Sequence, residues 1–299
     1  MAVFVQVPEV ATTVVFRRTP EGDSDLIVTG PRTRGRYHPL RLPTTCVRVP
    51  VRPSRVRAAL GVSPERLVNR AVRLTDLWGG AAVDLAGELA AFAPSRWIDV
   101  DRLAQPRDAF PDRLRPHSLP GHLPQPPADD PALERVAAIR ARISAELERR
   151  GGAQDGGEPK RRSGLRDGGE LVEFAIGELT GTTARLGEVA ARAGVSERRL
   201  RTLFTRDVGL SPKHVARIGR LRTVLTLAGT RGWAAVADDA GFFDQAHMIS
   251  DFRALMGVPP AAYLNGRTPG PTPCVPLSAG PDVGFDLRAQ PLTQVAVVG

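Results

Sequence analysis

Residues 241–263 read GFFDQAHMISDFRALMGVPPAAY, and this stretch decides the fold of the C-terminal half. Gly241 can end a helix, because glycine accepts the left-handed conformation found at helix ends. Asp244 follows three residues later and is a favoured N-cap for a new helix. That helix must stop before Pro259 and Pro260, since proline breaks the helical hydrogen-bond pattern. The stretch predicts a helix, a tight glycine turn and a second helix, which together form a helix-turn-helix.

The same arrangement occurs once more, earlier in the chain. The segment VAARAGVSERRLRTLFTRDVGLSP (189–212) aligns with residues 236–260, first at an offset of 47 and, after one inserted residue, at an offset of 48. The matched pairs are Gly194 and Gly241, Ser196 and Asp244, Leu200 and Met248, Phe204 and Phe252, Gly209 and Gly257, and Pro212 and Pro260. Matching caps, apolar anchors and endings indicate an internal duplication of one local structure.

The second helix of each copy has an apolar stripe and an opposite stripe at helical spacing. The inward stripes are Leu200, Leu203, Phe204 and Val208 in the first copy, and Met248, Ile249, Phe252 and Leu255 in the second. The outward stripes are Arg198, Arg201, Thr202 and Thr205, and then Ala246, His247, Ser250 and Arg253. Arginine, hydroxyl and small apolar side chains are suited to base edges in the major groove of DNA.

Each of these features has an ordinary structural reading. An arginine-rich exposed helix is usually only a solvated face, a single exposed histidine is usually a surface histidine, and one glycine turn between helices occurs in many helical proteins. Two copies at a fixed offset, with the same caps and the same Gly-x-x-Pro endings, are far more specific.

With these motifs, residues from about 170 to 264 resemble the DNA-binding domain of the AraC/XylS family of bacterial transcription regulators. The resemblance implies a long central helix at 211–229 and two recognition helices that enter successive major grooves about 34 Å apart. It implies base contacts by Arg198, Arg201, Thr202, Ala246, His247 and Ser250, phosphate contacts by Arg199, Arg206 and Gln245, and helix caps at Ser196 and Asp244. We expect most of the specificity in the first copy, because its arginines can bind guanine bidentately.

The rest of the chain predicts an α+β protein in which a small mixed β/α domain precedes the all-α domain. The expected divisions are 1–100 for an N-terminal regulatory domain, 101–166 for a helical connector and flexible linker, 167–264 for the double helix-turn-helix domain, and 265–299 for a Pro/Gly-rich tail.

Several elements can be expected from local patterns. The runs at 12–17 and 25–30 flank a turn-rich stretch and predict a hairpin. Residues 46–52 predict a strand at a sheet edge, because Pro50 cannot donate a ladder hydrogen bond. Helices are expected at 81–92 and 131–150, the second with an apolar stripe. That stripe consists of Val136, Ile139, Ile143 and Leu147.

Residues 1–100 resemble, more loosely, the regulatory half of AraC-type proteins, which is sometimes a cupin-like barrel. The strand runs here are too short for a full barrel, so a degenerate form is expected. No H-x-H pattern supports a metal site, and no cofactor is expected. Trp78 is interpreted as a core anchor, and Arg32, Arg34 and Arg36 as a solvated edge.

Composition limits the class of protein. The net charge of +9 suits an anionic partner, but 39 of the 41 basic residues are arginines, which a GC-rich genome would also favour. Two cysteines fit a reducing cytoplasm and are too few for a four-cysteine zinc site. Neither a signal peptide nor an apolar membrane-spanning stretch is present in the sequence, so a soluble cytoplasmic protein is expected.

Two other classes of protein compete with a sequence-specific regulator. An enzyme that couples this kind of domain to DNA-alkyl transfer fails on the cysteine count, and no phosphate loop, nucleophile elbow or paired-carboxylate motif is present. A non-specific architectural binder of nucleic acid is the alternative, although acidic residues in the second copy oppose binding by charge alone. Those residues are Asp238, Asp239, Asp244 and Asp251. The expected partner is double-stranded promoter DNA. RNA polymerase, a small-molecule effector and the oligomeric state stay open.

Overall fold

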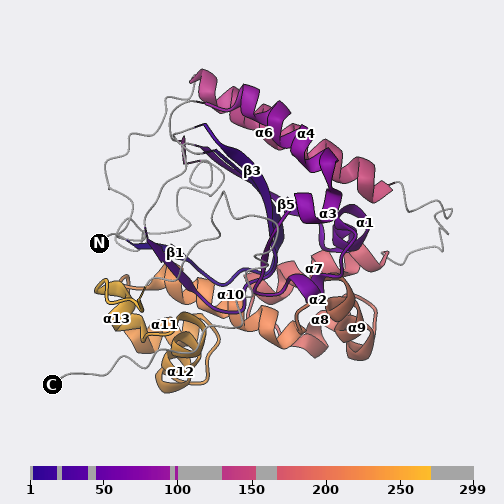
Figure 1. Cartoon of the computed structure of the whole chain (residues 1–299). Coiled ribbons are helices and arrows are strands. Elements are labelled where there is room, and N and C mark those ends of the chain that lie inside the picture. Colours follow the sequence, from indigo (N-terminus) through magenta and orange to yellow (C-terminus); the bar gives the residue numbers. More distant parts are fainter. Residues whose placement is uncertain are drawn as a thin grey trace.

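The computed structural model describes residues 3–18, 22–39, 45–94, 98–99, 130–152 and 167–270. The predicted α+β class is confirmed: strands dominate the start of the described chain and helices follow. Figure 1 shows the strands as a curved sheet, with one group of helices along one face and a second group below it.

The five-stranded sheet has the order β6-β3-β2-β5-β7. The expected hairpin is present as an antiparallel pair in which Val14 faces Val28. The strands are β2 (Thr12–Arg18), β3 (Ser24–Thr29), β5 (Thr45–Val51), β6 (Ala71–Arg73) and β7 (Ile98–Asp99). A separate two-stranded ribbon pairs β1 (Val3–Gln6) with β4 (Arg36–Pro39) in antiparallel register.

The strand containing Pro50 was predicted at a sheet edge, and the structure refines this prediction. β5 lies next to last, but β7 pairs only with Thr45 and Cys46 at its start. Pro50 lies opposite Thr13 of β2 and beyond the reach of β7. The half of β5 that carries the proline is therefore an edge among the described residues.

The helices α4 (Gly80–Phe92) and α6 (Pro131–Gly152) cover one face of the sheet (Figure 1). The shorter helices of this part of the chain are η1 (Pro53–Arg55), α1 (Val56–Leu60), α2 (Pro64–Leu67) and α3 (Thr75–Trp78). The predicted stripe of α6 is confirmed as buried, and it shares one core with Val14, Phe16 and Val47 of the sheet. The helix expected inside the 101–166 connector thus packs onto the N-terminal sheet.

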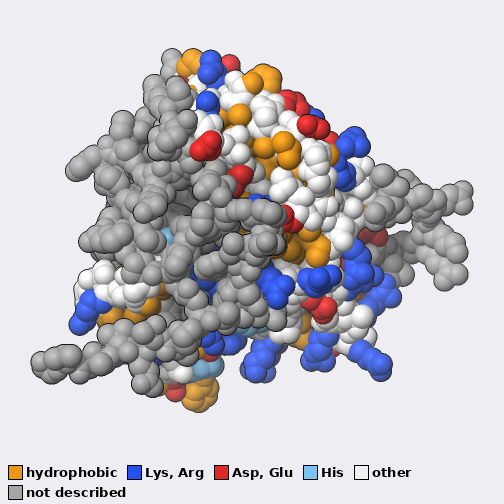
Figure 2. Space-filling view, in the orientation of Figure 1, with side chains coloured by type: hydrophobic (Ala, Val, Ile, Leu, Met, Phe, Trp, Pro, Cys, Tyr) orange, Lys and Arg blue, Asp and Glu red, His pale blue; other side chains and the backbone are white. Residues whose placement is uncertain are grey.

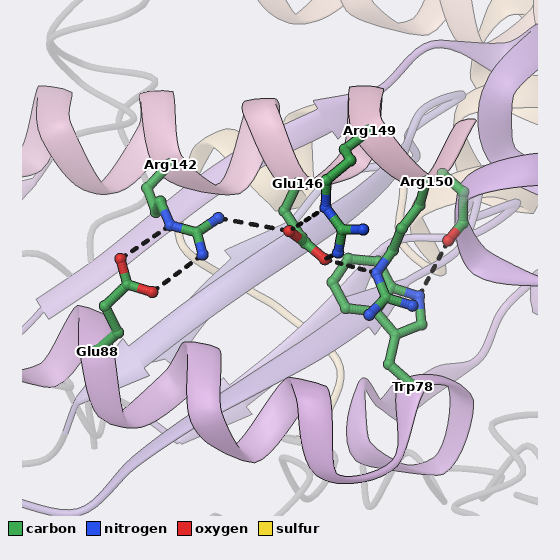
Figure 3. A network of polar contacts seen from close by, with 7 residues as sticks. Trp78, Glu88, Arg142, Glu146, Arg149 and Arg150 are labelled. Atoms are coloured by element: carbon green, nitrogen blue, oxygen red, sulfur yellow. Dashed lines mark hydrogen bonds and ion pairs between the residues drawn. The ribbon is translucent and has the colours of Figure 1, made fainter. Parts of the chain in front are cut away.

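A polar network joins α4 to α6 along the outside of this core (Figure 3). Glu88 of α4 accepts hydrogen bonds from Arg142 at 2.8 and 3.0 Å. Glu146 accepts from Arg149 and, at 2.7 Å, from Arg150. The Arg150 guanidinium lies 4.2 Å from the centroid of the Trp78 ring. Trp78 is half-buried against the core and donates its indole N–H to Ala59, so it acts as the anchor that was expected.

The second group of helices begins at residue 168. Its members are α7 (Gly168–Gly181), α8 (Leu186–Arg192), α9 (Glu197–Asp207), α10 (Pro212–Leu227), α11 (Trp233–Asp239), α12 (Gln245–Met256) and α13 (Pro260–Leu264). The long central helix is confirmed as α10. It contributes Val215 and Ile218 to the core of the first copy, and Leu221, Val224 and Leu225 to the core of the second.

The N-terminal part contacts both copies. Val10 and Val68 belong to the core of the first copy, and Tyr37 belongs to the core of the second. Glu9 forms a 2.5 Å ion pair with Arg222 of α10. The two parts of the chain therefore share apolar and charged contacts rather than only a linker.

The interpretation of Arg32 as part of a solvated edge was wrong. Its side chain is buried, and its Nε and Nη2 donate to the Val7 carbonyl at 3.4 and 3.3 Å. Burial, together with the nearby guanidinium of Arg48, lowers the pKa of Arg32 to about 9. Tertiary packing buries Arg32, and the arginine-rich sequence around it does not indicate this burial. Arg34, by contrast, is exposed.

Among the described helices, none is both long enough and apolar enough to cross a membrane.

Candidate nucleic-acid interface

The first outward helix, α9, starts at a turn that fixes its orientation. Gly194 has a φ of 67°, in the left-handed region that glycine tolerates. Ser196 accepts a 3.2 Å hydrogen bond from the Arg199 N–H, as an N-cap does. Leu200 and Phe204 are fully buried beneath the helix. The opposite face, with Arg198, Arg201, Thr202 and Thr205, is exposed as predicted.

The exposed side chains of α9 have weak partners on their own helix. Arg201 forms a 2.5 Å ion pair with Glu197, and both side chains are about half exposed, at 59% and 42%. Exposed pairs of this kind contribute roughly 0–1 kcal/mol. The hydroxyl of Thr202 donates to the Arg198 carbonyl at 3.1 Å. An anionic or acceptor surface can displace such contacts at little cost.

Arg199 and Arg206, the predicted phosphate contacts of α9, are both exposed. Arg206 donates to Asp207 at 2.6 and 2.7 Å, and these bonds raise the pKa of its guanidinium. The Asp207 carboxylate is buried and offsets part of the charge that Arg206 presents. Arg199, in the first turn of α9, therefore presents more unbalanced positive charge than Arg206 in the last turn.

The second outward helix, α12, repeats the construction. Gly241 has a φ of 72°, and Asp244 accepts a 2.7 Å hydrogen bond from the His247 N–H. Met248 and Phe252 are buried. Both predicted caps are thus present, and the outward residues Gln245, Ala246, His247, Ser250 and Arg253 are exposed. The two outward faces stand near opposite ends of α10 (Figure 1).

The ring of His247 has a fixed neighbour. It lies edge-on to the Phe242 ring, with centroids 5.3 Å apart and an interplanar angle of 89°. The Arg220 guanidinium also contacts Phe242, 5.1 Å from the ring centroid. The edge-on contact with Phe242 restricts the exposed imidazole, and such preorganisation reduces the entropy lost on binding.

The two copies differ in charge. Residues 189–212 carry five arginines and two acidic residues, a net charge of +3, whereas residues 236–260 carry one arginine and four acidic residues, a net charge of −3. Figure 2 shows basic side chains gathered over α8 and α9, while the surface around α12 mixes histidine, acidic and hydrophobic side chains. Asp251 forms a 2.8 Å ion pair with Arg217 of α10, and Asp239 forms a 2.6 Å ion pair with Arg231, so two of the four acidic residues are internally paired.

Sequence reasoning missed one prominent residue of this surface. Phe243, in the turn before α12, is 92% exposed. The signal was present in the alignment, since one residue is inserted between the turn glycine and the cap in the second copy. The pairing of Arg201 with Glu197 was also missed, although their spacing of four residues on a helix favours it.

Among the described residues, no group of three or more His, Cys, Asp or Glu side chains is arranged to hold a metal ion.

Comparison with known proteins places these features in a family context. The family described as "Helix-turn-helix domain" matches residues 189–266, which cover most of both copies. An uncharacterized HTH-type transcriptional regulator, YidL, from Escherichia coli K12 is 34% identical over 93 residues. That match covers 30% of this chain and 31% of YidL, so the chain spans about a third of the length of its curated relative.

Solved structures give weaker likenesses. A probable AraC family transcriptional regulator from Rhodopseudomonas palustris is 24% identical, with a TM-score of 0.30 over 33% of this chain and 99% of its own. The C-terminal domain of AraT, a response regulator from Geobacillus stearothermophilus, is 22% identical, with a TM-score of 0.31 over 33% and 88%. ToxT from Vibrio cholerae is 10% identical, with a TM-score of 0.34 over 89% and 99%. At these scores the structural likenesses carry no weight beside the sequence matches.

Proposed function

We propose that the protein is a transcription regulator that binds a specific sequence of duplex DNA, since residues 189–266 match a helix-turn-helix domain family and resemble the AraC type. The observation that carries the proposal is the duplication itself. Two capped helices, each with one buried and one exposed face, are attached to a single central helix, α10. Such an arrangement lets one chain present two recognition helices to one face of DNA.

In this proposal α9 and α12 enter successive major grooves. Arg198, Arg201 and Thr202 contact base edges in one groove, and Ala246, His247 and Ser250 do so in the next. Arg199, Arg206 and Gln245 contact phosphates and set the register. The exposure of all nine side chains supports these roles.

The two helices contribute differently. The charge of +3 on the first copy favours phosphate contacts and bidentate binding of guanine, whereas the second copy, at −3, gains little from phosphates. We therefore assign most of the affinity and most of the base specificity to α9. The second helix adds discrimination at a second half-site.

The N-terminal part is proposed to modulate DNA binding. The contact between Glu9 and Arg222, and the place of Tyr37 in the core of the second copy, support a direct route from one part to the other. The division of the chain at residues 100, 166 and 264 stays a prediction. The packing of α6 onto the sheet favours grouping residues 131–152 with the N-terminal part.

The alternative is an architectural protein that binds DNA through charge without reading sequence. The net charge of the whole chain, +9, favours it. The net charge of −3 on the second copy opposes it, because a binder that depends on counterion release gains nothing from an acidic half.

The deciding experiment is a binding-site selection from random duplex DNA with the full chain, repeated at two salt concentrations. An asymmetric motif with two halves about one helical turn apart is expected. Binding that enriches no motif and falls steeply with salt would overturn the proposal in favour of the architectural alternative.

A matched pair of variants makes the selection sharper. Arg201→Ala removes a proposed base contact, and Arg140→Ala removes an arginine from α6, a helix in the core with the sheet. The first is expected to relax one position of the motif and the second to leave the motif unchanged. Equal motifs from both variants would contradict the assignment of α9 as the main reading helix.

A further inference from the structure

The second copy contains one residue that the first copy lacks, and the structure identifies it. In the first copy the Val195 N–H donates to the Ala190 carbonyl at 3.0 Å, and in the second the Phe242 N–H donates to the Ala237 carbonyl at 2.9 Å. Val195 and Phe242 are therefore equivalent. The next equivalent residues are the caps, Ser196 and Asp244. Ser196 follows Val195 directly, whereas Phe243 stands between Phe242 and its cap.

This inserted residue is an almost fully exposed phenylalanine. Phe243 is 92% exposed, compared with 59% for Val83 and 52% for Phe92, the other large hydrophobic side chains exposed in the described part of the chain. Both of those lie on α4, away from α12 (Figure 1). A phenyl ring left in water gains none of the free energy that burial provides, so covering it with a binding partner is favourable.

The residues before and after Phe243 are both held in place. Phe242, before it, is buried against the core of the second copy. Asp244, after it, is fixed by its hydrogen bond to the His247 N–H. The turn also rests on Thr183, because a Cβ added to Gly241 would lie 2.7 Å from the Thr183 methyl. Phe243 thus lies between two neighbours that are each held in place.

We propose that Phe243 is a DNA-contact residue, which packs its ring against deoxyribose and a thymine methyl at the edge of the groove entered by α12. The proposal rests on the proposed function, since it needs α12 to face duplex DNA. Recognition helices of this type contact bases with their N-terminal residues. A side chain that immediately precedes the cap of α12 therefore lies beside the groove wall.

The net charge of the second copy favours an apolar contact by Phe243 over contacts with phosphate. The second copy has a net charge of −3, so its contacts with phosphate are weak. The groups of DNA that an apolar ring can bury are the sugar C–H surface and the thymine methyl in the major groove. Ala246, on the same exposed end of α12, offers a second small apolar surface for that methyl. The second helix would then bind by apolar contact where the first binds by charge.

The test compares the full chain with Phe243→Ser and with Phe92→Ser as a matched control. Affinity for the selected site is measured at several salt concentrations. Phe243→Ser is expected to weaken binding about tenfold, while the slope of log K against log salt stays the same, because an apolar contact releases no counterions. Phe92→Ser is expected to change neither quantity, and Phe243→Leu to retain most of the affinity.

Uracil in place of thymine provides a second readout. Removing the thymine methyls from the half-site of α12 is expected to weaken the wild-type chain and to have little further effect on Phe243→Ser. Additive losses from the protein and DNA changes would overturn the methyl contact.

Failure of this inference differs from failure of the proposed function. If the wild-type chain selects no motif, the proposed function falls. If it selects a motif and Phe243→Ser binds that motif like wild type, only the contact by Phe243 is wrong. Unchanged DNA binding with reduced transcription in a purified system would assign Phe243 to a protein partner such as the polymerase, and would overturn the inference. A salt slope that falls by about one would indicate a phosphate contact and would also overturn it.

Discussion

The Tyr37 hydroxyl donates a 2.6 Å hydrogen bond to the backbone carbonyl of Met256, the last residue of α12. Both residues are buried, and burial raises the pKa of the Tyr37 hydroxyl above its ordinary value. The Gly35 N–H adds a 2.7 Å bond to the carbonyl of Leu255. The strand β4 and the residue before it are therefore hydrogen-bonded to the end of α12, so a displacement of one moves the other.

Removing this bond should weaken the junction. Tyr37→Phe keeps the ring and leaves the Met256 carbonyl without its donor, which is expected to reduce the free energy of unfolding by about 1–3 kcal/mol. Urea denaturation of the full chain measures the loss. Tyr263→Phe is the control, since no described residue bonds to its hydroxyl, and it should cost less. Equal losses from both variants would show that the bond to Met256 contributes nothing of its own.

Two turn glycines with the same backbone conformation offer a second test. Gly194 and Gly209 have φ values of 67° and 76°. A Cβ at Gly194 meets nothing within 4 Å, whereas at Gly209 it would lie 2.7 Å from the Glu65 nitrogen and the Pro64 carbonyl carbon. Gly194→Ala should cost about 1–2 kcal/mol of stability from left-handed strain. Gly209→Ala should cost about 1–3 kcal/mol more, because α2 must move.

The difference between these two variants is measured by thermal or urea denaturation. Both variants carry the same left-handed backbone strain, so the difference between their losses of stability measures the contact between α2 and the turn at Gly209. A difference near zero would mean that α2 does not rest on the turn at Gly209.

The ion pairs of Glu146 with Arg149 and Arg150 on α6 predict that the free energy of unfolding depends on pH. Hydrogen bonds from Arg149 and Arg150 outweigh the effect of burial and lower the pKa of Glu146 to about 2. A carboxylate whose pKa is depressed in the folded state stabilises the fold above its unfolded pKa, and this contribution fades as pH falls toward the folded value. Glu146→Gln should therefore destabilise the chain at pH 7, and the difference from wild type should shrink between about pH 4.5 and 2.

Glu148→Gln, an exposed change two residues away on the same helix, is the control for this titration. Its effect on the free energy of unfolding should stay within about 0.5 kcal/mol. A constant difference between wild type and Glu146→Gln across the acid range would contradict the role of the carboxylate charge.

Substitutions on the exposed face of α9 are expected to weaken DNA binding, and substitutions on its buried face are expected to reduce stability. Arg201→Ala should cost about 1–3 kcal/mol in DNA binding and relax discrimination at one base pair, while stability changes little. Phe204→Ala should instead cost roughly 3–5 kcal/mol of stability, as a truncation of a fully buried ring. Fluorescence anisotropy with the selected duplex, beside urea denaturation, distinguishes the two losses.

A variant of the partner of Arg201 completes that prediction. Glu197→Gln frees the guanidinium from its ion pair and removes one negative charge from the face. Its affinity for DNA should rise, most visibly at low salt. A fall in affinity would mean that Glu197 orients Arg201 for binding rather than competing with DNA.

Local features allowed the two copies to be predicted from the sequence. Gly241 and Asp244 act within a few residues of each other, and the apolar spacing of Leu200 and Phe204 is a property of one helix. The same reasoning identified the stripe of α6. It could not identify what the stripe packs against, because the residues of one helix do not specify which distant element the helix covers.

The contacts between the two parts were beyond prediction for the same reason. Glu9 and Arg222 are 213 residues apart, and neither has a neighbour that signals the other. The prediction that Arg32 is solvated was wrong because neighbouring arginines in the sequence indicate an exposed segment, whereas tertiary packing buries this side chain. Phe243 was passed over because an alignment of two copies draws attention to what matches, and this residue has no match.

The place of Tyr37 in the core of the second copy has a consequence for synthesis of the chain. Tyr37 leaves the ribosome more than two hundred residues before Met256, so the surface that the last helices need is made long before those helices exist. The β1–β4 ribbon pairs apart from the main sheet, so it gains its apolar cover only when the last helices emerge. A nascent chain arrested before α12 is therefore expected to leave Tyr37 uncovered.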